Sequence, residues 1–249
     1  MHMNLTDRHR RIVSHIRECS PYGKAETERI IRKFFAHPQR IVRLLVNKHD
    51  FDRKKVLDIG SSYGQTLLHW GEHSEGFDVS DQFITFLQSL GKQVHKGNAE
   101  DGFPSVLHGN YDAIFTNNLL EHLVSPHLFL VRLFSLLRKN GVLAIGHPCV
   151  PPQPARLLWR MMGMQGWLAS EHINFFTPQT ARLFLERAGF TVEQQYFSAF
   201  ASVPILARAA VPFGIHCLSI CRKVDTYAYP PKRTSAFDPQ WANDLSFLR

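Results

Sequence analysis

The fold of this chain is decided by the stretch Val56-Leu57-Asp58-Ile59-Gly60-Ser61-Ser62-Tyr63-Gly64. It reads as a short apolar strand that runs into a Gly/Ser turn, and the residues from Gln65 to Trp70 are predicted to begin a helix. A strand, a glycine-containing turn and a helix commonly hold an anionic or polar cofactor, because glycines let the ligand approach the backbone. The turn is Asp-x-Gly-x-x-x-Gly and differs from the Gly-x-Gly-x-x-Gly of dinucleotide-binding enzymes. The sequence therefore predicts a cofactor site on this loop.

Short apolar strands alternate with helices on the C-terminal side of this loop. The predicted strands cover 56–60, 76–79, 93–95, 111–116, 141–146, 190–197 and 215–223, and the predicted helices cover about 83–90, 126–138 and 178–189. This alternation is typical of a parallel sheet covered by helices on both faces. We therefore expect an α/β fold with a seven-stranded, mostly parallel sheet.

The N-terminal segment differs from the rest in both pattern and charge. Apolar residues recur at helical spacing in two runs, Ile30, Ile31, Phe34 and Phe35, then Ile41, Val42, Leu44 and Leu45. Residues 1–55 hold 14 Lys/Arg against 6 Asp/Glu, a difference of +8, whereas residues 56–249 hold 15 of each. The excess charge indicates either a solvated helical face or a surface for an anionic partner such as RNA.

These patterns divide the chain into three parts. We expect a basic helical segment at 1–55, a cofactor-binding domain at 56–225 and an irregular C-terminal arm at 226–249. Within the domain, the Pro- and Met/Trp-rich stretch 148–176 breaks the strand–helix rhythm and is expected to cover an acceptor. The run from Trp159 to Trp167 fits such a lid, but it equally fits core packing or a contact in a homodimer.

Composition narrows the class of protein. Apolar residues make up 44% and charged residues 20% of the chain, as in soluble globular proteins. The four cysteines are scattered without a Cys-x-x-Cys pair, so neither a disulfide framework nor a zinc knuckle is expected. The N-terminus lacks the apolar run of a signal peptide, and charges and prolines interrupt the most apolar stretch, 197–221. We expect a cytoplasmic protein without a transmembrane segment.

The second predicted strand ends in Asp78, 14 residues after Gly64. An acidic residue at this strand tip is placed to accept hydrogen bonds from a ribose diol. The alternative is that Asp78 only caps the helix that follows. Together with Asp58 and Gly60, Asp78 favours a cofactor that contains a ribose.

These residues resemble the class I S-adenosylmethionine (SAM)-dependent methyltransferases, in particular the bacterial group that acts on small molecules, quinone precursors and glycans. Four segments carry the resemblance in order: Val56–Gly64, Gly76–Ser80, Gly97–Glu100 and Asn117–Leu123. Two further segments, Glu171–Thr177 and Arg187–Phe190, are also similar. The resemblance covers about residues 54–198, and it implies a Rossmann-like fold with additional N-terminal helices.

The resemblance implies a SAM site whose product is S-adenosylhomocysteine. Asp58 and the backbone from Gly60 to Gly64 would hold the amino acid part, Asp78 the ribose, Asn98 and Ala99 the adenine, and Asn117 would lie beside the methionine. The implied cofactor residues are Asp58, Gly60, Ser61, Ser62, Gly64, Asp78, Val79, Asn98, Ala99 and Asn117.

Two positions depart from the family pattern. Ser62 stands where family members often have glycine, which adds a side chain near the cofactor. Asn98 stands where aspartate is usual, although an asparagine can still accept a hydrogen bond from the adenine amine through its carbonyl oxygen.

Methyl transfer depends mainly on positioning the acceptor behind the sulfonium methyl. If the acceptor is a hydroxyl, a base must take its proton, and a histidine suits neutral pH. His172 is the first candidate and His122 the second, although His172 could instead brace the lid. Glu171, Phe175 and Trp167 are predicted to contact the acceptor, a small molecule or a glycan.

The related quinone-precursor O-methyltransferases imply a divalent metal site at a Glu-x-x-Glu-His pattern. Here the first position is Asn118, so Asn118, Glu121 and His122 would form a weaker ligand set. We expect no essential metal.

Three alternatives remain. Gly60–Gly64 also fits the Gly-x-Ser-x-Gly elbow of serine hydrolases, with Ser62 as nucleophile and Asp112 and His172 as partners, although only helices precede Val56. The basic segment 1–55 suggests an RNA-modifying methyltransferase, but the chain lacks the Asn/Asp-Pro-Pro-aromatic motif that base-amine enzymes often carry. A SAM-binding protein without catalytic activity is the third.

Overall fold

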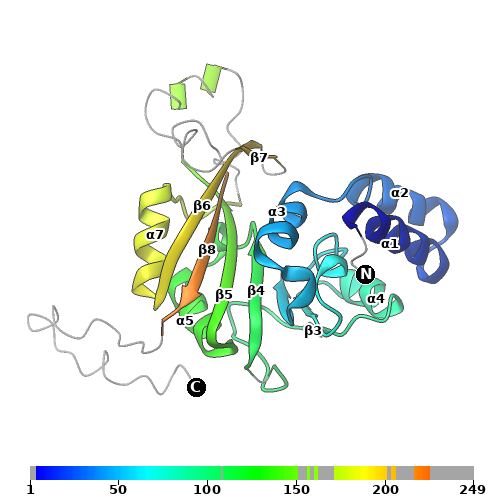
Figure 1. Cartoon of the computed structure of the whole chain (residues 1–249), viewed down its shortest axis with the longest axis horizontal. Coiled ribbons are helices and arrows are strands. Elements are labelled where there is room, and N and C mark those ends of the chain that lie inside the picture. Colours follow the sequence, from blue (N-terminus) through cyan, green and yellow to red (C-terminus); the bar gives the residue numbers. More distant parts are fainter. Residues whose placement is uncertain are drawn as a thin grey trace, which may run out of the picture.

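One eight-stranded mixed sheet forms the centre of the molecule (Figure 1). The structure is a computed structural model that describes residues 4–107, 109–150, 156–157, 160–161, 171–200, 203–205 and 216–224. The strands are β1 (Val56–Ile59), β2 (Glu75–Asp78), β3 (Val94–Lys96), β4 (Tyr111–Asn117), β5 (Leu137–Pro148), β6 (Phe190–Phe200), β7 (Val203–Ile205) and β8 (His216–Lys223). Their order is β3-β2-β1-β4-β5-β8-β6-β7.

The sheet confirms the predicted α/β class. β3, β2, β1, β4 and β5 run parallel, whereas β8 is antiparallel to both of its neighbours, β5 and β6. All seven predicted strands are present, and the three-residue edge strand β7 was not predicted. The chain order reverses between β1 and β4, and in sheets of this kind ligands bind at the carboxyl ends of the strands at such a switch point. The loop after β1 lies there.

Helices cover both faces of the sheet, as predicted. They are α1 (Leu5–Cys19), α2 (Lys24–Phe34), α3 (Arg40–His49), α4 (Asp81–Ser89), α5 (Pro126–Leu136) and α7 (Pro178–Arg187). Apolar residues of α1 to α4 pack with one face of the sheet, and residues of α5 and α7 pack with the other.

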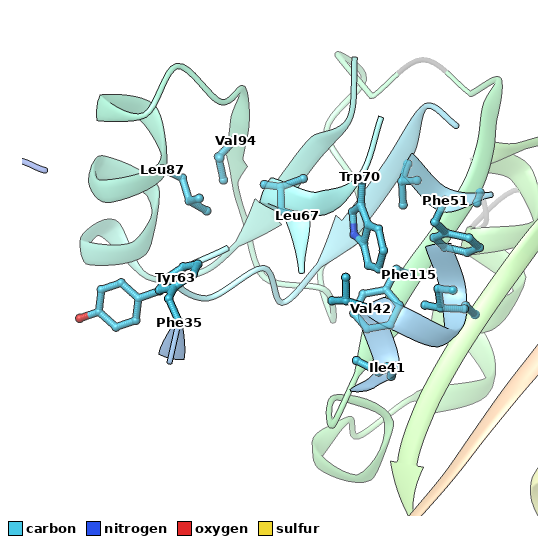
Figure 2. Close-up of a cluster of buried hydrophobic side chains, with 14 of the residues drawn as sticks. Phe35, Ile41, Val42, Phe51, Tyr63, Leu67, Trp70, Leu87, Val94 and Phe115 are labelled. Atoms are coloured by element: carbon cyan, nitrogen blue, oxygen red, sulfur yellow. The ribbon is translucent and has the colours of Figure 1, made fainter. Parts of the chain in front are cut away.

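The N-terminal helices are part of the main core. Ile16, Ile31 and Leu45 are buried in the same cluster as Val56 and Phe115 of the sheet. Figure 2 shows Ile41 and Val42 of α3 close to Trp70 and Phe115. Because burying apolar side chains is the main favourable term in folding, α1 to α3 stabilise the sheet that carries the loop after β1.

The predicted helix from Gln65 to Trp70 is wrong, because the structure has only a 3-10 turn, η2 (Leu67–His69). The buried Asp58 carboxylate accepts hydrogen bonds from the Thr66 hydroxyl (2.7 Å) and the Trp70 indole N–H (2.8 Å). These contacts bring Trp70 down against Phe51 and Phe115. Burial of the indole and its bond to Asp58 replace the helix that periodicity predicted.

Two predicted segments fall mainly outside the described residues. They are most of the acceptor lid at 148–176, including Trp167, and the arm at 226–249.

Candidate functional site

The loop after β1 folds back onto the end of β2. The Gly60 N–H donates to the Phe77 carbonyl (2.8 Å), and the Ser62 N–H donates to the Asp78 carboxylate (2.8 Å). Gly60 and Gly64 have φ angles of +74° and +77°. A Cβ at Gly60 would meet no atom within 4 Å, whereas one at Gly64 would lie 2.3 Å from Leu87. Space is therefore open above the first glycine, and the second is needed for packing.

Ser62 also has a left-handed backbone, with φ of +50°. Glycine adopts this conformation without the steric penalty that a Cβ brings. The position where relatives often carry glycine is thus one where the loop requires a positive φ. The departure at Ser62 alters backbone strain as well as adding a side chain.

Asp78 connects the loop after β1 to the end of β2 through its carboxylate. One carboxylate oxygen accepts from the Ser62 N–H and the other accepts from the Ser80 N–H (3.0 Å). Each carboxylate oxygen has two lone pairs, so both can accept further bonds from a ligand hydroxyl. Asp78 is 7% exposed, and the neighbouring Val79 is 65% exposed beside it.

Asp58 faces the scaffold rather than the open side of the loop. Its side chain is buried and bonded to Thr66 and Trp70. Burial raises the pKa of Asp58 to about 7, against the lowering effect of these two hydrogen bonds. The observed role of this carboxyl group is to hold the turn that carries Trp70.

The loop after β3 is attached to the start of α5. The Asn98 side-chain oxygen accepts from the Glu100 N–H (3.0 Å), and Ala99 is buried beneath it. The Glu100 carboxylate accepts from the Ser125 N–H (3.3 Å) and from the Val124 N–H. Glu100 was part of the quoted motif but received no role from the sequence. Its contacts fix the position of Asn98 and Ala99.

Asn117 and Asn118 end β4 with different contacts. The Asn117 side-chain oxygen is buried without a hydrogen-bond partner, and a Cβ at Gly146 would lie 2.0 Å from it, so only glycine fits there. Asn118 pairs with His216 (Oδ1 to Nε2, 3.1 Å). Burial lowers the pKa of His216 to about 3, so its imidazole is neutral at physiological pH and can donate this bond.

The end of the sheet at β1 and β4 fits a polar cofactor. Four buried side-chain atoms here lack a hydrogen-bond partner: Ser61 Oγ, Gln65 Oε1, Thr116 Oγ1 and Asn117 Oδ1. Buried polar groups are rarely left unpaired, because their desolvation then costs free energy. The open space lies above Gly60, and these enclosed polar atoms surround the base of the loop.

The candidate bases lie together beside this edge. The segment that contains His172 is attached to the one that contains His122: the Ile173 and Asn174 N–H groups donate to the Glu121 carbonyl (2.9 and 3.0 Å). The His122 and His172 rings meet edge to face with centroids 4.9 Å apart. The His122 Nδ1 also lies 3.0 Å from the Glu171 carbonyl oxygen. The structure therefore brings His122, His172 and Glu171 together, while Phe175 is 52% exposed nearby in the chain.

Glu121, which the sequence suggested only as a member of a weak metal-ligand set, is buried beside the candidate bases. Its side chain is 1% exposed, neither carboxyl oxygen has a hydrogen-bond partner, and Oε1 lies 3.8 Å from His122 Nε2. Burial raises its pKa, against the charges of His122, His147 and His172. Glu121, His122 and His172 each place one ligand atom within 4.8 Å of the others. Asn118 instead pairs with His216, so the set of Asn118, Glu121 and His122 does not form.

The hydrolase alternative requires Asp112 near His172, and the structure separates them. Asp112 lies at the start of β4, where it accepts from the Lys55 N–H and pairs with Arg138. His172 lies beside the residues that follow the other end of β4. Asn117 lies five positions along the strand from Asp112, or roughly 16 Å away. A Ser62–His172–Asp112 triad is therefore not assembled.

Comparisons with known proteins agree with this geometry. A family model described as a methyltransferase domain matches residues 27–195. The comparison with curated proteins found no match. No described helix is long and apolar enough to cross a membrane.

Solved structures share the fold at low sequence identity. A SAM-dependent methyltransferase of Thermotoga maritima, described as a possible histamine N-methyltransferase, has a TM-score of 0.57 and 18% identity, covering 85% of this chain and 100% of that one. A magnesium protoporphyrin IX methyltransferase of Synechocystis PCC 6803 with bound S-adenosylhomocysteine has a TM-score of 0.54 and 15% identity, covering 88% and 94%. A SAM-dependent methyltransferase of Mesorhizobium loti has a TM-score of 0.52 and 16% identity, covering 74% and 96%.

Proposed function

We propose that this chain, which belongs to the methyltransferase domain family and is a class I enzyme that uses SAM, methylates a hydroxyl oxygen. The acceptor is a small molecule or a glycan, and His172 is the general base. Bound SAM supplies an electrophilic methyl group on a sulfonium. Asp78 and Val79 would hold its ribose, Asn98 and Ala99 its adenine. Asn117 and the loop residues Gly60, Ser61, Ser62 and Gly64 would hold its amino acid part, and Asp58, expected from the sequence to bind it, would support the loop from below through Thr66 and Trp70.

The observation that supports His172 is its place beside Glu121 and His122, next to the end of β4. In methyl transfer the acceptor oxygen would take the methyl group as the methyl–sulfur bond breaks and S-adenosylhomocysteine leaves, and the hydroxyl proton would pass to the imidazole of His172. The buried carboxyl group of Glu121 can stabilise the imidazolium that forms. His122 is the second candidate for the base. The exposed Ile173 and Phe175, with Glu171 and Trp167, would contact an acceptor that has an apolar part.

The test is His172→Ala, with His73→Ala as the control because His73 is an exposed histidine away from this cluster. The acceptor is first found by screening sugars, phenolics, quinone precursors and RNA with radiolabelled SAM. Loss of a general base should lower turnover by about 10²- to 10⁴-fold, while SAM affinity stays unchanged. Wild-type turnover in His172→Ala rejects the base. A SAM-binding protein without catalysis would form no S-adenosylhomocysteine with any acceptor.

RNA modification is the second candidate, and the charge of residues 1–55 favours it. Arg10, Arg17 and Arg29 pair with acidic residues of the same segment. Each of these ion pairs has no net charge, so the excess of +8 in residues 1–55 is carried by the other basic side chains. RNA binding that persists at about 0.3 M salt would favour this candidate, since electrostatic contacts alone weaken steeply there. A homodimer and a cytoplasmic location stay predictions.

A further inference from the structure

A second cluster of ligand atoms, made of residues other than the candidate bases, lies at the end of β5. His147, Cys149 and Cys217 each place one ligand atom within 4.8 Å of the others. All three residues are 0% exposed. The proposed function uses none of them.

Strand pairing explains why these side chains meet. His147 of β5 lies directly opposite Cys217 of β8 in the antiparallel register. Directly opposed residues project to the same face of a sheet, and so do residues two apart along an extended strand. Cys149 follows His147 by two residues and continues the extended chain through a bridge to Phe176. The three side chains therefore converge from one side of two strands.

Aromatic side chains pack around the cluster, and its sulfur atoms have only long contacts with polar atoms. Cys149 and Cys217 pack with Phe197 in a small cluster of their own, and the ring centroids of Phe176 and His147 are 5.4 Å apart. The Cys149 sulfur lies 3.8 Å from His147 Nδ1, and the Cys217 sulfur lies 3.7 Å from the Ser219 hydroxyl oxygen. His147 Nδ1 lies 3.0 Å from the Pro148 carbonyl oxygen, and the buried Nε2 has no hydrogen-bond partner. The two thiols therefore have only long contacts with polar atoms, and one imidazole nitrogen has no hydrogen-bond partner.

We propose that His147, Cys149 and Cys217 bind one zinc ion. Two thiolates and an imidazole are ligands that zinc prefers, whereas magnesium and calcium prefer oxygen ligands. Zinc bonds of about 2.3 Å to sulfur and 2.0–2.1 Å to nitrogen in a tetrahedron place the ligand atoms about 3.5–3.8 Å apart. The Cys149 sulfur and His147 Nδ1 are 3.8 Å apart, and all three residues bring a ligand atom within 4.8 Å of the others, close to this geometry. Both thiol protons leave on binding, and three protein ligands leave a fourth position for water or another group.

The cluster of Glu121, His122 and His172 is the competing zinc site. It offers a carboxylate and two imidazoles and is partly exposed, whereas the proposed site is fully buried and contains both thiols. Thiolate ligation distinguishes the two sites, because only one of them contains sulfur. The proposal is independent of the methyl acceptor and of the role of His172.

The experiment uses the full chain, stripped with a chelator and then loaded with Zn²⁺ or Co²⁺. We expect one zinc per chain by elemental analysis, and a sulfur-to-cobalt charge-transfer band with Co²⁺. Cys149→Ser and Cys217→Ser should lose the band and the zinc. Cys221→Ser should keep both, because Cys221 is equally buried on β8 but lies four residues beyond Cys217 and outside the cluster of ligand atoms. Removal of zinc should lower the melting temperature of the wild type.

Three outcomes overturn the proposal. One is wild-type protein without a charge-transfer band. Another is zinc that the Cys149→Ser/Cys217→Ser double variant retains and a His122→Ala/His172→Ala variant loses. The third is a Cys149–Cys217 disulfide in freshly purified protein, seen as an intact mass two hydrogens lower that reduction restores. The cobalt spectrum of the wild type decides the matter even if a cysteine variant fails to fold.

Discussion

At the scale of single residues, Ser62 shows how backbone geometry gives meaning to a departure from a motif. Its φ of +50° lies in the region that glycine occupies at least cost. Nothing in the sequence around Ser62 reveals that angle, because it follows from the fold of the loop onto β2. The departure could be read from the sequence, but its physical effect could not.

Ser62→Gly should stabilise the protein by about 1 kcal/mol, because glycine relieves the left-handed strain. The matched control is Ser61→Gly, at a neighbour whose φ is not positive. There the added chain entropy should destabilise by about 0.5–1 kcal/mol. Urea unfolding of both variants measures the difference. If Ser62→Gly destabilises as much as Ser61→Gly, the strain at Ser62 is absent.

Some residues of the candidate site could be predicted from the sequence, and others could not. Asp58 and Asp78 could be singled out because each lies in the last residues of a predicted strand, and Asn98 through the resemblance of Gly97–Glu100 to the family motif. The isolation of the Glu121 carboxyl group depends on the segment at Ile173 folding over it. The meeting of His147 with Cys217 depends on an antiparallel pairing between residues far apart in the chain. No local pattern encodes either contact.

At the scale of elements, strands were predicted better than the turn that follows β1. Apolar periodicity identified seven strands because their side chains are buried on both faces. Periodicity over Gln65–Trp70 predicted a helix, but it carries no information about the bonds from Thr66 and Trp70 to Asp58. Tertiary hydrogen bonds to one buried carboxyl group overrode the local preference.

The contact between α1 and η2 is expected to make stability depend on pH. His69 of η2 stacks on His9 of α1, with Nε2 of His69 3.3 Å from Nδ1 of His9. Burial lowers the pKa of His69 from 6.5 to about 3. The unfolded chain therefore binds a proton that the folded chain excludes, so this stability is complete above about pH 6.5 and is lost as pH falls towards 3.

His69→Leu should remove this dependence. Its free energy of unfolding will be lower than that of the wild type at neutral pH, since His9 loses a partner. The gap between the two proteins should narrow as the pH falls from about 6.5 towards 4. Urea titrations at several pH values measure it, with exposed His73→Leu as the control. A gap that stays constant with pH contradicts a buried, neutral His69.

At the scale of the whole molecule, the N-terminal segment and the sheet form one core. Helical spacing predicted the buried faces of α2 and α3, and the structure places them against the strands that carry the cofactor loop. Tyr63 of this loop packs against Phe34 of α2 with ring centroids 4.8 Å apart, and Figure 2 shows Tyr63 and Phe35 in the same buried cluster. The basic charge of residues 1–55 therefore belongs to helices that support the cofactor site.

The central claim is that the loop Asp58–Gly64 and Asp78 hold the methyl donor, and calorimetric titration with S-adenosylhomocysteine tests it most directly. The account predicts one binding site per chain in the wild type. Asp78→Ala should bind about tenfold or more weakly, as expected when a charge-assisted hydrogen bond is lost, whereas Asp81→Ala, at an exposed acid three residues later, should bind normally. No binding at millimolar ligand, or equal affinity in wild type and Asp78→Ala, would contradict the account.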